Sequence, residues 1–231
     1  MSFFWDSFVA AIRLVLSLDR ELLDIVTVSL SVSCSSTTLS ALIALPLGFW
    51  ITFSSFKSKR LLITILNTLL SLPTVVIGLF VYTFLSRRGI FGSFELLYTT
   101  KAIVIGQVIL IVPLITALTI AALDRIDKGY WKTARTLGAS DLQAAFLVFQ
   151  EGRFSLIAVL ITAFGRVISE IGISMMLGGN IKGFTRTMTT AMALEYDKGA
   201  FVLAISLGLV LLSISLLMNI LFAVFQGSSG K

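Results

Sequence analysis

The sequence has no histidine and only one cysteine among its 231 residues. Histidine is the commonest general base and the commonest neutral metal ligand, so this sequence lacks the side chain that most often serves in either role. A metal site would need a cluster of carboxylates within the apolar segments, and no such cluster is present. The single cysteine, Cys34, excludes an intrachain disulfide and leaves the redox compartment open. We therefore predict no catalytic residue, no metal and no cofactor of the chain's own.

Charged residues are also scarce. They make up 13% of the chain, and 57% of the residues are hydrophobic, whereas soluble proteins have about 25% charged residues. The mean hydropathy is +1.00, so lipid must solvate most of the surface, and the chain is predicted to be an integral membrane protein. The net charge is +6. We attribute it to basic residues in loops, which set the orientation of the chain in the membrane, and not to a surface that binds nucleic acid.

Long apolar runs are what the sequence does contain. A membrane-spanning helix needs about 20 mostly apolar residues. Five runs meet this requirement, and they lie within residues 22–53, 61–85, 102–123, 154–177 and 200–225. The first run exceeds one crossing, and Pro46 and Gly48 near its end could bend it. The predicted fold class is an all-α membrane protein with one transmembrane domain over residues 21–226. The final residues 227–231 read as a linker or tag remnant.

The segment 3–18 is too short to span. Asp6, Arg13, Ser17 and Arg20 follow one another at spacings of seven, four and three, which places them on one helical face, and the opposite face is apolar. Such a pattern is typical of a helix that lies in the membrane interface, so we predict an amphipathic interfacial helix over residues 1–20. A cleaved signal peptide fits poorly, because it would begin with basic residues.

Two short loops carry basic residues and predict the orientation. The loop "SSFKSKR" holds Lys57, Lys59 and Arg60, and the loop 124–153 holds five more basic residues. With five spans both loops lie on the same side of the membrane. The excess of lysine and arginine in cytoplasmic loops predicts that this side is the cytoplasm. The N-terminus then lies outside and the C-terminus lies in the cytoplasm.

The loop 124–153 has signals of its own structure. Residues 130–137 predict a short helix that Gly138 terminates. Ser140 is a plausible N-cap with Asp141 in the following first turn, where a negative charge is favourable, and "LQAAFLVF" predicts a second short helix with an apolar face. Exposed apolar residues need a partner surface, and folding back on the membrane bundle is an equally good interpretation of the pattern.

Two further features lie inside the apolar runs. Pro73 in "SLPTVVIGL" removes a backbone hydrogen bond and predicts a kink in the second span. Backbone groups freed by a kink are tolerated at membrane depth where protein or a water-filled cavity covers them. The kink is therefore either a packing feature or part of a polar pathway.

The second feature is a pair of opposite charges, Arg166 and Glu170, four residues apart in the fourth run. A charge at the bilayer centre costs about 2.5–3.5 kcal/mol, and two residues at this spacing can pair on a helix. The pair is either a salt bridge that fixes helix register or a polar lining in which Arg166 offers donors to an anion. Small residues on the same predicted span would allow close helix packing or leave room for an ion, and they are Gly165, Ser169, Gly172 and Ser174.

The loop 124–153 resembles the conserved cytoplasmic loop of ABC-importer permeases, which reads Glu-Ala-Ala, three residues, Gly, nine residues, Ile-x-Leu-Pro. Ala134 matches the second alanine, Gly138 the glycine and Val148 the isoleucine, whereas "KT" and "QE" replace Glu-Ala and Leu-Pro. In that family the short helix inserts into a cleft of the ATPase subunit. The resemblance implies these ATPase-coupling residues: Ala134, Leu137, Gly138, Ala139, Ser140, Asp141, Leu142, Ala145 and Phe146.

Other segments resemble oxyanion permeases over residues 27–225. "SLPTVVIGL" is similar to the "PPTVVGL"-like segment of molybdate and sulfate permeases, and "AFGRVISEIGISMMLGGNI" to their "FARALGEFGATLMLAGNI" region. "TRT" at 185–187, followed by "AMALEYDKG", matches the next element of that family, and "GRVISE" and "MTTAMALE" are most similar to tungstate-type members. The resemblance implies these pathway residues: Arg166, Ser169, Glu170, Ser174, Pro73 and Thr74.

The resemblance implies a type I ABC importer fold that works as a homodimer in the cytoplasmic membrane. The chain would be the permease subunit of an ATP-driven importer for an oxyanion, with tungstate expected. The chain lacks a GxxxxGK[ST] loop, so ATP and Mg would bind a separate cytoplasmic ATPase. The expected partners are a second copy, that ATPase, an extracytoplasmic oxyanion-binding protein and membrane lipid. The alternatives are a permease for molybdate, sulfate or an amino acid, or a stand-alone channel or secondary transporter.

Overall fold

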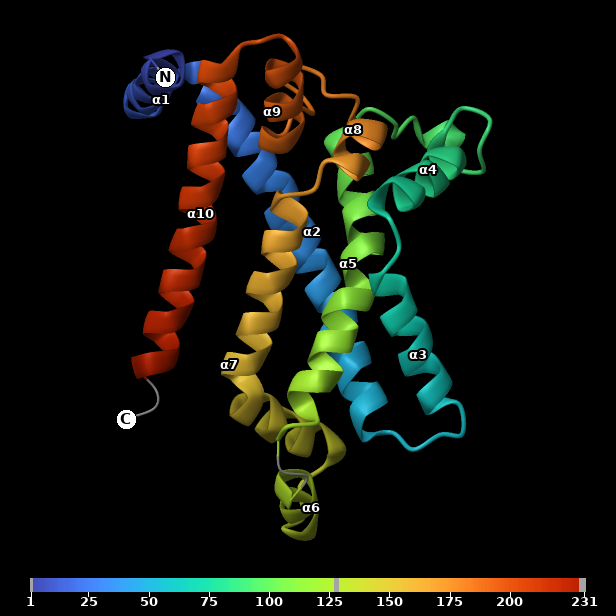
Figure 1. Ribbon diagram of the computed structural model, residues 1–231. Coiled ribbons are helices and arrows are strands. Elements are labelled where there is room, and N and C mark those ends of the chain that lie inside the picture. Colours follow the sequence, from blue (N-terminus) through green and yellow to red (C-terminus); the bar gives the residue numbers. More distant parts are fainter. Residues whose placement is uncertain (1, 127–128, 229–231) are drawn as a thin grey trace.

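The computed structural model describes residues 2–126 and 129–228, and this part of the chain folds into helices without any strand. Four helices are long and apolar enough to cross a membrane. They are α2 (Arg20–Phe53), α5 (Thr100–Leu123), α7 (Asp141–Ile168) and α10 (Phe201–Ser228), and they run side by side between the two ends of the bundle (Figure 1). A fifth span results when the bent pair α3 (Lys59–Leu70) and α4 (Thr74–Leu85) is counted as one.

The two ends of the bundle differ. Helices α1 (Ser2–Leu16), α4, α8 (Gly172–Gly178) and α9 (Met188–Asp197) gather at one end, called here the α1 end. Helix α6 (Gly129–Thr136) projects from the opposite end, where α10 also ends (Figure 1). The described parts of the two basic loops, residues 54–60 and residues 124–126 and 129–140, both lie at this α6 end. The predicted placement of these loops on one side of the bundle is confirmed.

Helix α5 forms the centre of the bundle and packs on α2, α3, α7 and α8. Its buried Ile111 and Ile115 pack with Ala44 of α2 and with Val159 and Ala163 of α7. Helix α2 is uninterrupted from residue 20 to residue 53, with the proline at position 46 inside it. The apolar core is therefore shared by three spans, as expected for a small bundle.

The second predicted span is broken rather than kinked. Helix α3 ends at Leu70, and α4 begins at Thr74 with its axis bent by 98°. Pro73 occupies the N-cap position of α4, because proline lacks the N–H that a continuing helix needs and disfavours the helical conformation of the residue before it. Helix α4 and the loop after it, which includes the short 3-10 helix η1 (Gly92–Phe94), lie at the α1 end. The sequence predicted one span within residues 61–85 that is kinked at Pro73, and the structure places the interruption there but separates the span into two helices.

The fourth predicted span differs from the observed helix α7 at both ends. Helix α7 begins at Asp141, so "LQAAFLVF" is the first part of this span and not a separate short helix. Helix α7 also stops at Ile168, and α8 begins at Gly172, although the prediction continued the span to residue 177. The backbone groups at this break bind side chains from other elements, which a hydrophobic pattern along one helix does not reveal.

A helix is present at the N-terminus as predicted, but it is shorter than predicted, and its position in the membrane interface stays a prediction. Helix α1 ends at Leu16, and the carboxylate of Asp19 accepts hydrogen bonds from the backbone N–H groups of Glu21 and Leu22. This N-cap starts α2, so Arg20 belongs to α2 and not to the polar face of α1. Helix α1 packs on α10, where the Ser206 hydroxyl donates to the carbonyl of Ala11 at 3.2 Å.

Candidate functional site

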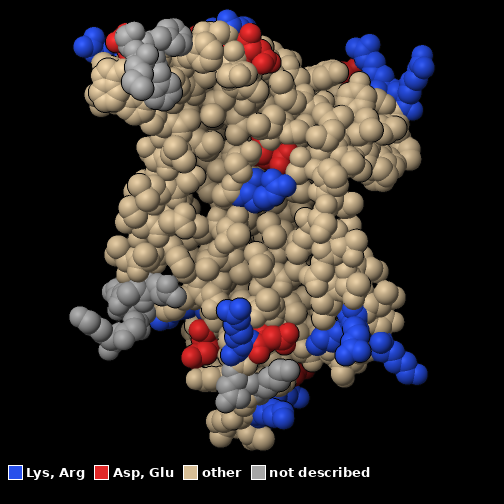
Figure 2. All heavy atoms as spheres, in the orientation of Figure 1, with Lys and Arg blue, Asp and Glu red and all other residues tan. Residues whose placement is uncertain are grey.

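The candidate site lies at the break between α7 and α8. The Arg166 Nη1 atom donates to Glu170 Oε2 at 2.9 Å. The Arg166 side chain is 42% exposed, whereas the Glu170 side chain is only 3% exposed. Figure 1 shows that α7 ends between the two ends of the bundle, and Figure 2 shows one basic and one acidic group together in the middle of an otherwise uncharged surface. The structure thus holds a buried carboxylate that orients an open guanidinium.

The Glu170 carboxylate has partners on both of its oxygens. Its Oε1 atom accepts the backbone N–H of Ile173 at 3.3 Å, and its Oε2 atom holds Arg166. The backbone carbonyl of Glu170 accepts the Thr189 hydroxyl of α9 at 2.9 Å. A buried charge is tolerated when it is paired and hydrogen-bonded in this way. The break therefore has a defined geometry set by α7, α8 and α9.

The broken second span also reaches this place. A Cβ atom added at Gly172 would lie 2.9 Å from Thr74 Oγ1 and 3.3 Å from Glu170 Oε1. The hydroxyl of Thr74, at the start of α4, thus comes close to the carboxylate at the start of α8. Thr74 was predicted as a pathway residue from a distant part of the sequence, and the fold brings its hydroxyl near Gly172 and Glu170. Pro73, which was predicted with it, precedes it as the N-cap of α4.

Two other predicted pathway residues, Ser169 and Ser174, differ in their exposure. Ser169 is exposed next to Arg166, and its hydroxyl donates to the carbonyl of Gly165 at 2.8 Å. Ser174 lies on α8 with its side chain fully buried, so it does not border the open surface of Arg166. The expectation that Ser174 and Gly172 share one helix with Arg166 is wrong, because the helix ends at Ile168.

The surface around Arg166 is made of small and polar residues. Ser155, Thr162, Gly165 and Ser169 are exposed along α7 at helical spacing, on the side that carries Arg166. A Cβ atom at Gly165 would meet nothing within 4 Å, which means open space beside the guanidinium. Lipid does not favour such a polar surface. It fits a water-filled pathway or a second protein chain.

Sequence reasoning missed three residues of this site: Gln107, Thr189 and Ser36. Gln107 on α5 is 1% exposed and its Nε2 atom donates to the carbonyl of Val167 at 3.3 Å. Its Oε1 atom accepts the hydroxyl of Ser36 on α2 at 2.8 Å. A glutamine within the apolar run "AIVIGQVILIV" is the signal that could have identified it.

The predicted coupling segment forms a turn at the α6 end. Helix α6 covers residues 129–136, and Gly138 follows with φ +89°, the left-handed conformation that glycine favours after a helix. Ser140 caps α7 through a capping box with Gln143, so the predicted helix stop and N-cap are confirmed. Arg135 braces the turn with an ion pair to Asp141 at 3.2 Å.

The apolar residues of this segment divide into two groups. Ala134 and Val148 are buried, and Val148 packs with Leu123 and Leu156 of the bundle. Leu137 is 82% exposed and Phe146 is 65% exposed. Ala139 and Ala145 are half-buried, and the side chain of Leu142 lies outside the described residues. The segment therefore both folds back on the bundle and presents an apolar surface to the solvent.

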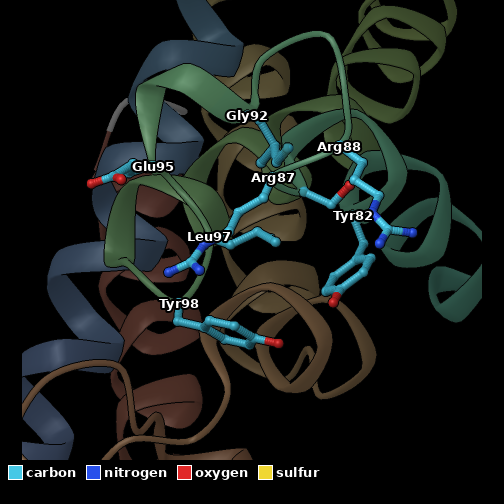
Figure 3. Close-up of a pocket in the computed structure, with 9 residues that line it drawn as sticks. Tyr82, Arg87, Arg88, Gly92, Glu95, Leu97 and Tyr98 are labelled. Atoms are coloured by element: carbon cyan, nitrogen blue, oxygen red, sulfur yellow. The ribbon is translucent and has the colours of Figure 1, made fainter.

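A basic pocket of about 580 Å³ lies at the α1 end, between α4 and the loop that follows it. Tyr82, Arg87, Arg88 and Tyr98 line it, and Figure 3 shows the carboxylate of Glu95 pointing away from it. Over residues 2–126 and 129–228, no carboxylate forms an ion pair with either arginine. A hydrogen bond with Tyr82 raises the pKa of the Tyr98 phenol, so this phenol stays protonated. The pocket thus gathers donors for an anionic group.

The comparisons with known proteins decide the family. The model of the family described as "Binding-protein-dependent transport system inner membrane component" matches residues 44–228. The chain belongs to this family. The tungstate uptake system permease protein TupB of Peptoclostridium acidaminophilum is 40% identical to this inner membrane component over 219 residues, which cover 95% of this chain and 96% of that relative. TupB of Campylobacter jejuni is 38% identical over 219 residues, covering 95% and 92%.

Solved structures agree on the fold of the inner membrane component. A bacterial ABC transporter involved in the import of the acidic polysaccharide alginate matches with a TM-score of 0.77 at 16% identity, covering 98% of this chain and 84% of that chain. The predicted type I ABC importer fold is confirmed, as is the prediction of a transmembrane permease subunit of an ABC importer in the inner membrane. The alternative of a stand-alone channel or secondary transporter is set aside.

Proposed function

We propose that this inner membrane component moves an oxyanion and that the oxyanion is tungstate. The likeness to two tungstate permeases over 95% of the chain carries this assignment. The open Arg166 guanidinium fits it chemically, because a planar fork of N–H donors matches the oxygens of an oxyanion. Molybdate and sulfate share this chemistry and are the alternative cargoes.

In this proposal Arg166 stabilises the anion only while it passes. Glu170 binds one nitrogen of the guanidinium, and the Arg166 side chain is still 42% exposed, so its other N–H donors are available to an anion. The carboxylate also offsets the positive charge, so the anion is held less tightly than by a lone arginine. Conduction needs binding that is favourable enough for entry and weak enough for release.

Transport further requires partners that bias two conformations. A second copy would face this one across the small, polar surface of α7. A separate cytoplasmic ATPase, which holds ATP and Mg, would dock on Leu137 and Phe146 at the α6 end. This end carries the two basic loops and is assigned to the cytoplasm, with the N-terminus outside and the C-terminus inside.

Helix α7 offers a direct route for coupling. It runs without interruption through 28 residues, from Asp141 beside the docking surface to Ile168 beside the anion site. Its length is about 42 Å at the rise of an α-helix. A displacement of its first turn by the ATPase would therefore be passed along one continuous helix to Arg166.

Uptake by cells with and without the gene tests the cargo. Tungstate, molybdate and sulfate are supplied at low concentration, and cellular tungsten, molybdenum and sulfur are measured by elemental mass spectrometry. Selective loss of tungsten accumulation is expected on deletion. Loss of molybdenum or sulfur instead would correct the cargo, and unchanged uptake of all three would refute the oxyanion assignment.

The basic pocket at the α1 end is proposed as a contact for the extracytoplasmic binding protein. Reversing both charges, with Arg87→Glu and Arg88→Glu, should lower uptake by roughly tenfold at limiting oxyanion, because charge complementarity mainly sets the rate of docking. Arg13→Glu on α1 reverses an exposed charge at the same end and should have little effect. Equal uptake by the two variants would remove the pocket from the docking surface.

A further inference from the structure

We propose that Gln107 and Thr189 are positioning residues for the Arg166–Glu170 pair. This inference rests on the proposed function, in which Arg166 contacts the passing anion. Neither residue borders the open space beside Arg166, since Gln107 is 1% exposed and Thr189 is 5% exposed. Both act through the backbone of the break between α7 and α8.

Gln107 donates a hydrogen bond to the same backbone carbonyl that accepts the N–H group of Glu170. The backbone N–H of Glu170 donates to the carbonyl of Val167 at 3.1 Å, and Gln107 Nε2 donates to the same carbonyl at 3.3 Å. The amide is in turn contacted by Ser36, whose single hydroxyl hydrogen is shared between Gln107 Oε1 and the carbonyl of Val32, each at 2.8 Å. Three spans, α2, α5 and α7, are thereby joined at Val167, one residue before the end of α7.

Thr189 holds the other backbone hydrogen-bonding group of Glu170, its carbonyl. Its hydroxyl, in the first turn of α9, donates to the carbonyl of Glu170 at 2.9 Å. The backbone of Glu170 is therefore fixed at its N–H through Val167 and at its carbonyl through Thr189. A helix ends with carbonyls that have no partner of their own, and these contacts supply donors to such groups at membrane depth.

The position of the Glu170 backbone sets the direction of Arg166. The carboxylate is almost fully buried and reaches Arg166 Nη1 with one oxygen, while the guanidinium is 42% exposed. A side chain with this much freedom takes its orientation from its one anchored nitrogen. Functional groups need supporting contacts that hold them within about 0.5 Å of the productive geometry.

Packing alone does not explain a glutamine at position 107. The contact between α2, α5 and α7 already contains Ala44, Ile111, Ile115, Val159 and Ala163. An apolar residue would fill the same volume without a buried amide that must be fully hydrogen-bonded. We therefore attribute the glutamine at this position to its hydrogen bond with the carbonyl of Val167, next to the break.

Isosteric variants separate positioning from packing. Gln107→Leu and Thr189→Val keep the volume and remove the hydrogen bonds, and Thr189→Ser restores the hydroxyl. Thr116→Val is the matched control, because Thr116 is a fully buried threonine on α5 whose hydroxyl donates to Val112 within its own helix. Maximum tungstate uptake per unit of membrane-inserted protein should fall about tenfold in the first two variants and stay near wild type in the others.

A second comparison asks whether these residues act through Arg166. Residues that act as one unit are not additive, so adding Thr189→Val to Arg166→Lys should lower uptake less than it does in the wild type. Full additivity, or wild-type uptake by Gln107→Leu and Thr189→Val, would overturn the positioning role. If Gln107→Leu does not accumulate, the comparison of Thr189→Val with Thr189→Ser decides alone. Wild-type uptake by Arg166→Ala would instead exclude Arg166 from the pathway, and the loss or retention of uptake on deletion of the gene tests the proposed function separately.

Discussion

Replacing Arg166 and Glu170 together with glutamine is expected to abolish most tungstate uptake while the protein still accumulates in the membrane. The double variant removes both charges, so it leaves no buried, unpaired carboxylate at a position that is 3% exposed. Two glutamines can still hydrogen-bond to each other across the former ion pair. A charge-assisted hydrogen bond contributes about 1.5–3 kcal/mol, so losing it in the pathway should lower uptake by roughly 10- to 100-fold.

Single variants complete this experiment. Arg166→Ala leaves Glu170 buried without its partner, which costs about 3–5 kcal/mol, so uptake and protein level can fall together. Uptake in cells is therefore divided by the amount of protein in the membrane for each variant. Arg166→Lys keeps the charge but loses the planar fork, and an intermediate rate is expected. Wild-type uptake by the double glutamine variant would mean that the ion pair only fixes the register of the helices.

Gly138→Val is expected to prevent recovery of the ATPase with this chain. Gly138 has φ +89°, and a branched side chain in this conformation is strained by about 1–2 kcal/mol. A Cβ atom there would meet nothing within 4 Å, so the strain acts on the direction of the turn and not on the membrane core. The turn places Leu137 and the start of α7, so the docking surface should be lost and uptake with it.

A glycine at the opposite end gives the matched control. Gly183 also has a positive φ, +74°, and a Cβ atom there would likewise meet nothing within 4 Å. Gly183→Val introduces the same kind of strain far from the proposed dock. Co-purification of the ATPase from detergent extracts should drop more than tenfold for Gly138→Val and remain for Gly183→Val. An ATPase that is retained by both variants contradicts the coupling role of Gly138.

Local chemistry explains which features could be predicted from the sequence. Apolar runs long enough to span the membrane, the helix stop at Gly138 and the N-cap at Ser140 depend on residues close together in the chain. The break near Pro73 belongs to this group as well, because proline acts on its own backbone and on the residue before it. The pairing of Arg166 with Glu170 followed from a spacing of one helical turn.

The end of α7 at Ile168 could not be predicted in this way. Ser169, Glu170 and Gly172 follow Ile168, but none of them ends a helix by itself. The donors to the backbone carbonyls at the break come from Gln107 and Thr189. These residues lie 60 and 19 positions away from their acceptors in the sequence. Only packing of α5 and α9 against the break brings them within reach.

The sequence by itself thus determined the class of the protein, the approximate positions of its apolar spans and the turn at Gly138, because hydropathy and capping act over a few neighbouring residues. The tertiary structure decided which member of the charged pair is buried and which is open. It also decided that the helix that begins after this turn continues without a break to Arg166. These properties depend on contacts between spans, and such contacts follow from the shape of the whole bundle.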